Sequence, residues 1–329
     1  MEHEELYAAA EAPLPDAFEA TVRSRAAAED DLLGRENVVG VGIGRKIKDG
    51  VQTETPSVMV LVSHKLPPGV LGSDLVPKTV GRQPTDVLEV GTLFAGDDAA
   101  PASDLDVLTL RERVRPVRPG YSVGHPSVTA GTIGAGCYDL SPFPSKPPRY
   151  YILSNNHVLA NSNDARIGDP VIQPGRVDGG TAPGDVIGRL ARFVPIKFDG
   201  TCNHVDAAVA EVVFHQLDRD IYWNGHPASL AQAAAVGMVL KKTGRTTDFT
   251  TGRVTAIAAT VNVNYGGGRV AKFCNQIVTT DMSAGGDSGS LVLDVANNPV
   301  GLLFAGSSVA TILNPIATVQ LALQVRLWP

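Results

Sequence analysis

Three short stretches of the sequence contain residue types that can together perform nucleophilic acyl transfer. His157 lies in SNNHVLA, Asp206 in NHVDAAVA and Ser288 in GGDSGSLV. A serine hydroxyl is a weak nucleophile at neutral pH and needs a nearby base to remove its proton. An imidazole can accept this proton, and a carboxylate can fix the imidazole tautomer. We therefore expect Ser288 to be the nucleophile, His157 the general base and Asp206 the group that orients His157.

The sequence around each residue is compatible with these roles. His157 follows the apolar run YYIL, which predicts a position at the end of a strand. Asp206 begins an otherwise apolar strand, where an unpaired carboxylate would be costly, so a partner is expected. The order His–Asp–Ser excludes the α/β-hydrolase arrangement, which also needs a second glycine where this chain has Ser290.

The glycines beside Ser288 suggest how a developing oxyanion would be bound. Gly286 can adopt backbone angles that other residues resist, so its N–H and that of Ser288 can point into one oxyanion hole. The structural alternatives are a polar turn at Ser288, a carbonyl-bonded histidine at 157 and a capping acid at 206.

Nearby polar residues are assigned lesser roles. We expect His204 to lie at the rim of the site, and Asn155 and Asn156 to form a turn. Neither Cys202 nor Cys274 has the sequence setting of a nucleophile.

The combined motifs resemble those of the trypsin-like, chymotrypsin-fold serine peptidases in their disulfide-free bacterial and organellar form. The resemblance covers roughly residues 120–329 and implies two six-stranded β-barrels with the triad in the cleft between them. GRTTDFTTGRV, residues 244–254, resembles a strand-turn-strand segment of the second barrel. The layout of the whole chain resembles the plant narrow-leaf trypsin-like proteins and their bacterial relatives.

The same resemblance implies positions for substrate recognition. Met282, six residues before Ser288, would lie at the base of the primary pocket, and Phe304, Ala305 and Gly306 would lie on the strand that pairs with the substrate backbone. An apolar residue at 282 predicts a preference for apolar or small side chains before the scissile bond. We also expect internal groups to hold Asp287, so that no proteolytic activation is needed.

Residues 1–115 precede the region of this resemblance, and their sequence predicts a small α+β unit. Asp16 to Leu33 is expected to be a helix with capping-box spacing at Asp16 and Glu19 and one face formed by Phe18, Val22 and Ala26. Asp49-Gly50 predicts a hairpin turn. The glycines at 40, 42 and 44 do not open a helix, so they do not form a dinucleotide fingerprint.

The linker RPVRPG, residues 115–120, marks the expected boundary with a mainly β domain, residues 116–329. Eight short apolar runs separated by glycine and proline predict a sandwich or barrel there. A hairpin tip is expected at Gly266 to Gly268, a short helix at Ala228 to Ala235, and an exposed proline-rich loop at Ser141 to Pro148.

Composition narrows the classes of function further. The net charge of −6 over 329 residues favours neither nucleic acid nor a membrane surface as a partner. The three cysteines are expected to be reduced and buried, because their spacing does not suggest a disulfide framework or a metal site, although one pair could bond. The acidic N-terminus does not resemble a secretory signal, so a cytoplasmic location is predicted. We expect neither a cofactor nor a metal.

Two functions remain open from the sequence. The first is a serine endopeptidase acting on proteins or peptides; the second is a binding or scaffolding protein on a peptidase fold, with vestigial or regulated chemistry. The N-terminal unit has three candidate roles: docking against the barrels, building a homo-oligomer through strand edges, or shutting the cleft until a partner arrives.

Overall fold

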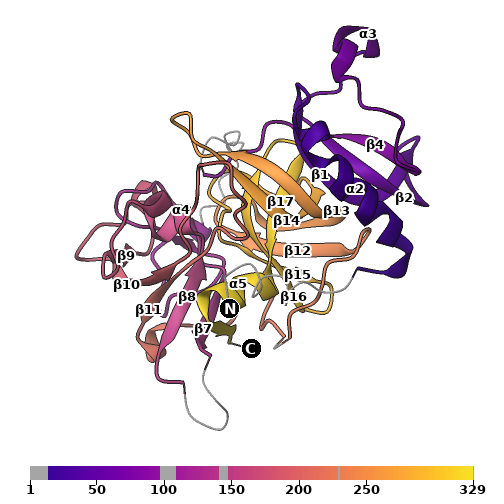
Figure 1. Ribbon diagram of the computed structural model, residues 1–329. Coiled ribbons are helices and arrows are strands. Elements are labelled where there is room, and N and C mark those ends of the chain that lie inside the picture. Colours follow the sequence, from indigo (N-terminus) through magenta and orange to yellow (C-terminus); the bar gives the residue numbers. More distant parts are fainter. Residues whose placement is uncertain (1–13, 97–108, 141–146, 229, 329) are drawn as a thin grey trace.

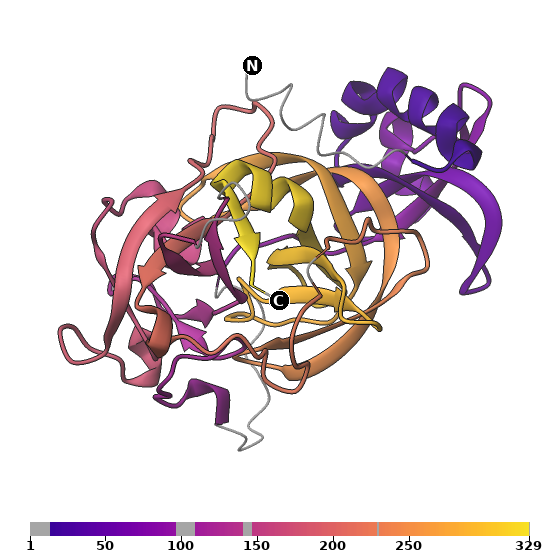
Figure 2. The ribbon, with the colours of Figure 1, turned by 90° about the horizontal axis from the view of Figure 1, so that it is seen from below.

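The computed structural model describes residues 14–96, 109–140, 147–228 and 230–328. Strands dominate these residues and form three parts, which follow one another in the colour sequence of Figure 1. In both views the N-terminal unit (indigo) and the first barrel (magenta) lie on opposite sides of the second barrel (orange and yellow; Figures 1 and 2). None of the described helices is long and apolar enough to cross a membrane.

The second barrel is a closed ring of six antiparallel strands. Their order is β12-β15-β16-β17-β14-β13, and β13 pairs back with β12. The six strands are β12 (Val239–Gly244), β13 (Asp248–Asn264), β14 (Val270–Thr280), β15 (Leu291–Asp294), β16 (Pro299–Gly306) and β17 (Ala310–Pro315). The predicted hairpin tip at Gly266 to Gly268 is confirmed, and all three glycines have positive φ.

The first barrel also has six strands, in the order β18-β7-β8-β11-β10-β9. They are β7 (Ala135–Asp139), β8 (Tyr150–Ser154), β9 (Pro170–Ile172), β10 (Val186–Phe193), β11 (Ala208–Val212) and β18 (Val325–Leu327). Helix α5 (Ile316–Leu323) leads from β17 of the second barrel to β18 of the first. The last strand of the chain therefore ties the two barrels together.

Short elements complete the described part of the two-barrel region. They are the strand pair β5 (Ser122–Val123) and β6 (Gly131–Thr132), the helix α4 (Asn156–Leu159), and the 3-10 turns η3 (Thr109–Arg111), η4 (Asn161–Asn163), η5 (Arg176–Asp178) and η6 (Phe214–Gln216). All eight predicted apolar runs contain a strand. The expected proline-rich loop falls largely on residues 141–146, outside the described residues.

The N-terminal unit contains a helix that packs on a sheet. Its elements are η1 (Asp16–Phe18), α2 (Glu19–Leu33), β1 (Val38–Lys48), β2 (Val51–Val62), α3 (Pro68–Leu71), η2 (Gly72–Asp74), β3 (Thr79–Val80) and β4 (Gln83–Glu89). The predicted hairpin is confirmed, since Asp49 and Gly50 adopt φ values of 53° and 78° between β1 and β2.

Two local predictions were wrong. The helix expected over residues 16–33 forms as η1 and α2, but Asp16 makes no capping hydrogen bond through its side chain. Of the expected face, Phe18 is buried and Val22 packs beside it, whereas Ala26 is exposed. In the described part of residues 228–235 no helix forms. The backbone N–H groups of Ala228 and Gln232 instead donate to the carbonyls of Asn297 and Pro299.

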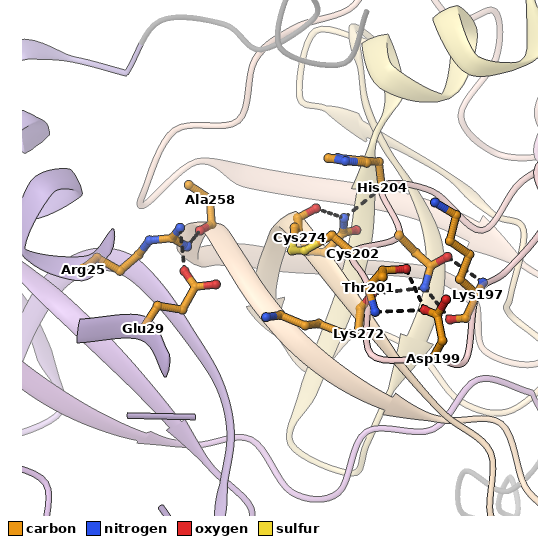
Figure 3. The surroundings of a disulfide bond; sticks show 12 residues. Arg25, Glu29, Lys197, Asp199, Thr201, Cys202, His204, Ala258, Lys272 and Cys274 are labelled. Atoms are coloured by element: carbon orange, nitrogen blue, oxygen red, sulfur yellow. Dashed lines mark hydrogen bonds and ion pairs between the residues drawn. A yellow bond between two sulfur atoms is a disulfide. The ribbon is translucent and has the colours of Figure 1, made fainter. Parts of the chain in front are cut away.

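The N-terminal sheet is continuous with the second barrel because β1 pairs antiparallel with the C-terminal half of β13. The glycines of β1 allow this close approach. A Cβ on Gly40 would lie 2.7 Å from the carbonyl oxygen of Thr260, and a Cβ on Gly44 would lie 2.7 Å from the carbonyl oxygen of Thr255. Arg25 on α2 adds a hydrogen bond to the carbonyl of Ala258 on β13 (Figure 3). The domain boundary at residue 115 stays a prediction.

The expectation of reduced cysteines and of a disulfide-free peptidase type was wrong. Cys202 and Cys274 form a disulfide, whereas Cys137 is free and buried (Figure 3). Cys202 lies in the loop that leads from β10 to Asp206, and Cys274 lies on β14 of the second barrel. Asn203 reinforces the link, since it exchanges backbone hydrogen bonds with Lys272 and Cys274. The spacing rule failed because these cysteines are 72 residues apart and meet only through tertiary structure.

This disulfide should contribute substantially to stability, because it closes a long loop in the unfolded chain. Reduction is expected to lower the free energy of unfolding by about 2–5 kcal/mol. Urea unfolding with and without dithiothreitol measures the effect. The Cys202→Ser/Cys274→Ser double variant serves as the control and should be insensitive to dithiothreitol; equal stability of the oxidised and reduced wild type would contradict the prediction.

Candidate active site

His157 and Asp206 form a buried pair at the ends of neighbouring strands. His157 lies on α4, directly after β8, and Asp206 comes two residues before β11, which pairs with β8. Nδ1 of His157 is 2.6 Å from Oδ2 of Asp206, and the His157 backbone N–H donates to Oδ1 at 3.2 Å. The carboxylate can therefore fix both the tautomer and the orientation of the ring.

Two further residues hold Asp206, and the sequence analysis missed both. The Tyr265 hydroxyl donates to Oδ2 of Asp206 at 2.7 Å, and the backbone N–H of Asp206 donates to the side-chain oxygen of Asn314 at 2.9 Å. Burial and the nearby Asp206 carboxylate raise the pKa of Tyr265 well above its usual value, so this phenol remains a neutral donor. Both residues come from the second barrel and lie far from Asp206 in sequence.

Ser288 lies in a tight turn that is bonded to the short strand β6 and to the second barrel. The Ser288 carbonyl accepts from the Thr132 backbone N–H of β6 at 2.8 Å, while the Gly289 N–H donates to the Leu303 carbonyl of β16 at 2.8 Å. Gly289 has a φ of 96°, and a Cβ there would lie 2.1 Å from Ser154 Oγ. Only glycine can occupy this position, since the turn requires both the positive φ and the absence of a side chain.

The segments that carry His157 and Ser288 approach each other at Gly131 of β6. A Cβ on Gly131 would lie 2.4 Å from Val158 Cγ2, next to His157, and 2.9 Å from the carbonyl oxygen of Ser288. Among the described residues, Nε2 of His157 is buried without a hydrogen-bond partner. The structure thus brings His157 and Asp206 into contact, and it does not form the expected hydrogen bond between His157 and Ser288.

The backbone donors expected to form an oxyanion hole have no partner in the described part of the chain. Neither the N–H of Gly286 nor that of Ser288 makes an internal hydrogen bond there. Gly286 has a φ of 93°, and its carbonyl accepts from the Thr132 hydroxyl at 2.9 Å. The Thr246 hydroxyl donates to the Gly285 carbonyl at 2.6 Å, so the peptide groups on both sides of Gly286 are held while its N–H stays available.

Asp287 is held by internal groups. Lys242 Nζ on β12 lies 3.0 Å from Oδ2 of Asp287, and both side chains are fully buried. Thr247 donates its hydroxyl at 2.6 Å, and the backbone N–H groups of Thr246 and Ala284 donate at 2.8 and 3.0 Å. Burial alone would raise the pKa of Asp287, but Lys242 and these donors outweigh it and hold the pKa below its usual value.

The residues expected to bind substrate lie in the second barrel. Met282 is 3% exposed and packs in a hydrophobic cluster that includes Leu240 and Val254, while Phe304 and Ala305 are buried on β16. The hydroxyls of Ser283 and Thr311 lie 2.7 Å apart, and Ser283 Oγ is 3.2 Å from a Cβ built on Gly306. The roles of Met282 and of Phe304 to Gly306 remain predictions.

The other polar residues have structural contacts. The Asn155 side chain donates to the Asp206 carbonyl at 2.7 Å, and Asn156 donates to Asn163 and to the carbonyl of Val194. The partly buried His204 accepts a hydrogen bond at its carbonyl from Gln276. Asn155 thus holds the acid-bearing segment as well as forming the turn that was expected.

No family model matches the chain. A curated relative, Glutamyl endopeptidase 2 of Streptomyces griseus, is 49% identical over 72 residues, which make up 21% of this chain and 35% of the relative. The chain therefore matches about a third of the length of that relative. This local match confirms the resemblance to trypsin-like serine peptidases that the motifs predicted.

Several solved structures are similar to part of the chain. Thermobifida fusca Protease A aligns with 64% of this chain and 97% of its own at 17% identity, with a TM-score of 0.45. For Nocardiopsis protease the shares are 65% and 99%, the identity is 16% and the TM-score is 0.46. A glutamic acid-specific serine protease aligns over 64% and 100% at 22% identity, with a TM-score of 0.45.

The Lys242–Asp287 pair gives a stability prediction. Lys242→Met leaves a buried carboxylate without its cation, which should cost about 3–5 kcal/mol of unfolding free energy at pH 7. Lys241→Met is a matched control, because this neighbouring side chain is only partly buried and points to the other face of β12. Urea unfolding compares both variants with the wild type.

The contribution of Asp287 to stability should depend on pH with opposite signs in the wild type and in Lys242→Met. In the wild type the folded pKa of Asp287 is depressed, so its contribution is complete above the unfolded value of about 3.9 and is lost as the pH falls through the folded value. In Lys242→Met burial should raise the folded pKa, so stability should increase as the pH falls from 7 to 5. Parallel pH profiles would contradict this account.

Proposed function

We propose that the protein is a serine endopeptidase that hydrolyses peptide bonds through an acyl-enzyme. The observation that carries this proposal is the buried His157–Asp206 pair, whose Nε2 lacks a partner among the described residues, beside the Ser288 turn and two free backbone donors. The name of the Streptomyces griseus relative supports the same class of reaction.

The chemistry follows from the roles of these groups. His157 Nε2 takes the proton from Ser288 Oγ as the oxygen attacks the substrate carbonyl, and Asp206 stabilises the imidazolium through Nδ1–H. The N–H groups of Gly286 and Ser288 would bind the oxyanion; removing one such donor typically costs about 3 kcal/mol. His157 then protonates the leaving amine as the C–N bond breaks, and water hydrolyses the ester by the reverse sequence.

The His157–Ser288 hydrogen bond that is missing in the structure does not argue against this mechanism. Catalytic hydrogen bonds are often long or poorly aligned without substrate and tighten when the substrate binds. The alternative, a binding or scaffolding protein with vestigial chemistry, gives no reason for an imidazole nitrogen kept buried and unpaired, which costs free energy unless it is used.

Two observations bear on the residue before the scissile bond. Met282 supports the small or apolar preference expected from the sequence, because trypsin-type recognition of Lys or Arg needs an acid at the pocket base. The relative is named a glutamyl endopeptidase, and the Ser283–Thr311 hydroxyl pair near Gly306 offers neutral donors to a carboxylate. A glutamate preference is therefore the second candidate.

The proposed partners are protein or peptide substrates, and the N-terminal unit remains a candidate surface for self-association. The cytoplasmic location predicted from the sequence stays a prediction. The Cys202–Cys274 disulfide argues against a strongly reducing compartment, where such bonds are rare.

A fluorophosphonate probe tests the nucleophile directly. We expect the wild type to be labelled at Ser288, and Ser288→Ala to lose all labelling. His157→Ala should label at least about 100-fold more slowly, because general-base catalysis typically contributes 10²–10⁴-fold. Ser308→Ala is the control, since this serine is exposed on the same barrel and has no proposed chemical role. Labelling that survives in Ser288→Ala would exclude the proposed mechanism.

A panel of reporter peptides that differ only in the residue before the scissile bond tests specificity. Leu and Ala peptides should be cleaved at least about tenfold faster, in kcat/KM, than Lys and Arg peptides, because no acid is present at position 282. A Glu peptide cleaved faster than all of these would select the second candidate. Preferred cleavage after Lys or Arg would rule out both.

A further inference from the structure

We infer that residues 90–95 of this chain occupy the groove in which an extended peptide would pair with β16, and hold that groove closed. The inference rests on the proposed function and concerns the regulation of the same site. It explains how the N-terminal unit could control a peptidase whose catalytic pair is already assembled.

The first observation is the pairing at Gly306, the last residue of β16. The N–H of Phe94 donates to the Gly306 carbonyl at 3.0 Å, and the N–H of Gly306 donates to the Phe94 carbonyl at 3.0 Å. The two residues form an antiparallel bridge. Gly306 belongs to the segment expected to pair with the substrate backbone. A peptide using the same two backbone groups of Gly306 cannot bind while Phe94 does.

The second observation is that the segment is also bonded on its other side. The N–H of Asn264, at the end of β13, donates to the Leu93 carbonyl at 2.9 Å, and the N–H of Ala95 donates to the Asn264 carbonyl at 3.0 Å. Residues 93–95 therefore lie as a short strand between the ends of β13 and β16. The next residue, Tyr265, is the donor to Asp206, so the segment lies beside the candidate catalytic groups.

Side chains anchor this segment as well as its backbone. Val90 is fully buried and Leu93 is 1% exposed, and both belong to the hydrophobic cluster that contains Phe304 and Ala305. The Ser307 hydroxyl donates to the Val90 carbonyl at 2.6 Å. Leu93 thus packs with the residues that the sequence analysis expected to contact substrate.

The pairing of the N-terminal sheet does not involve residues 93–95, so displacing these residues leaves that sheet paired. Strand β4 ends at Glu89, before the docked residues, and Phe94 and Ala95 are only partly buried. A displaced segment would lose the Gly306 and Asn264 bonds while β1, β2 and β4 keep their pairing. With the groove closed, a longer substrate gains no contact at Gly306, so it should be cleaved no better than a short one.

The experiment compares two capped reporter substrates that carry the same residue before the scissile bond. One substrate has that single residue and the other has four, so that only the longer one reaches Gly306. The test variant is Phe94→Pro, which removes the N–H that donates to Gly306. Thr92→Ala is the control, because this side chain is exposed on the same segment. All proteins are the full chain.

In the wild type and in Thr92→Ala, we expect kcat/KM for the two substrates to agree within about threefold. In Phe94→Pro the value for the long substrate should rise at least about tenfold, equivalent to 1.4 kcal/mol, while the value for the short substrate changes less than about twofold. A wild type that already prefers the long substrate tenfold, or a Phe94→Pro variant with an unchanged ratio, overturns the inference.

A second variant guards against misfolding of Phe94→Pro. Ser307→Ala removes the hydroxyl that donates to the Val90 carbonyl and should shift the ratio in the same direction by a smaller factor. Thermal unfolding of each variant confirms that it is folded.

Fluorophosphonate labelling in the same samples separates this inference from the proposed function, because the small probe does not reach Gly306. Where labelling is absent, binding of a fluorescent four-residue peptide decides the question by anisotropy. Tenfold tighter binding to Phe94→Pro than to the wild type supports the inference, and equal binding overturns it.

Discussion

The buried carboxylate of Asp206 is the group on which the arrangement of the two barrels depends. An ionised carboxylate without partners inside a protein is very costly, so its donors must be in place. Its partners come from both barrels, His157 from the first and Tyr265 from the second. The barrels must therefore dock before Asp206 is satisfied. The disulfide at Cys202 and Cys274 ties the segment leading to Asp206 to the same second barrel.

The Ser288 turn also contains a buried carboxylate, that of Asp287, which needs partners from other parts of the chain. The backbone of the turn is bonded to Thr132 of the short strand β6 and to Leu303 of the second barrel, and Lys242 holds Asp287. A buried ion pair contributes little net stability, but removing one partner is strongly destabilising. The pair therefore acts to specify one turn conformation. The cation that pairs with Asp287 is the side chain of an internal lysine.

The sequence predicted the parts of the site that are encoded by short motifs and missed the parts that are made by long-range contacts. His157, Asp206 and Ser288 each lie in a stretch with its own local signal, and the β-rich runs alternate with turn residues in a way that predicts barrels. Tyr265 and Lys242 have no such signal, because a tyrosine near a hairpin or a lysine in a strand is ordinary. Only the fold shows that they face a buried carboxylate. The same reason explains the missed disulfide.

The segment at residues 90–95 is a further feature that depends on long-range contacts and has no local signal in the sequence. Strand β4 ends at Glu89 and the following residues cross to the second barrel, a path that depends on long-range contacts. The N–H of Val90 still donates to Val62 of β2, so the segment is delivered by the N-terminal sheet. That sheet is in turn fixed to β13 through β1. Tethering at so short a range gives a high effective concentration at Gly306, which a free peptide must overcome. A partner that pulls on the N-terminal sheet would act on Gly306 through the few residues between Glu89 and Phe94.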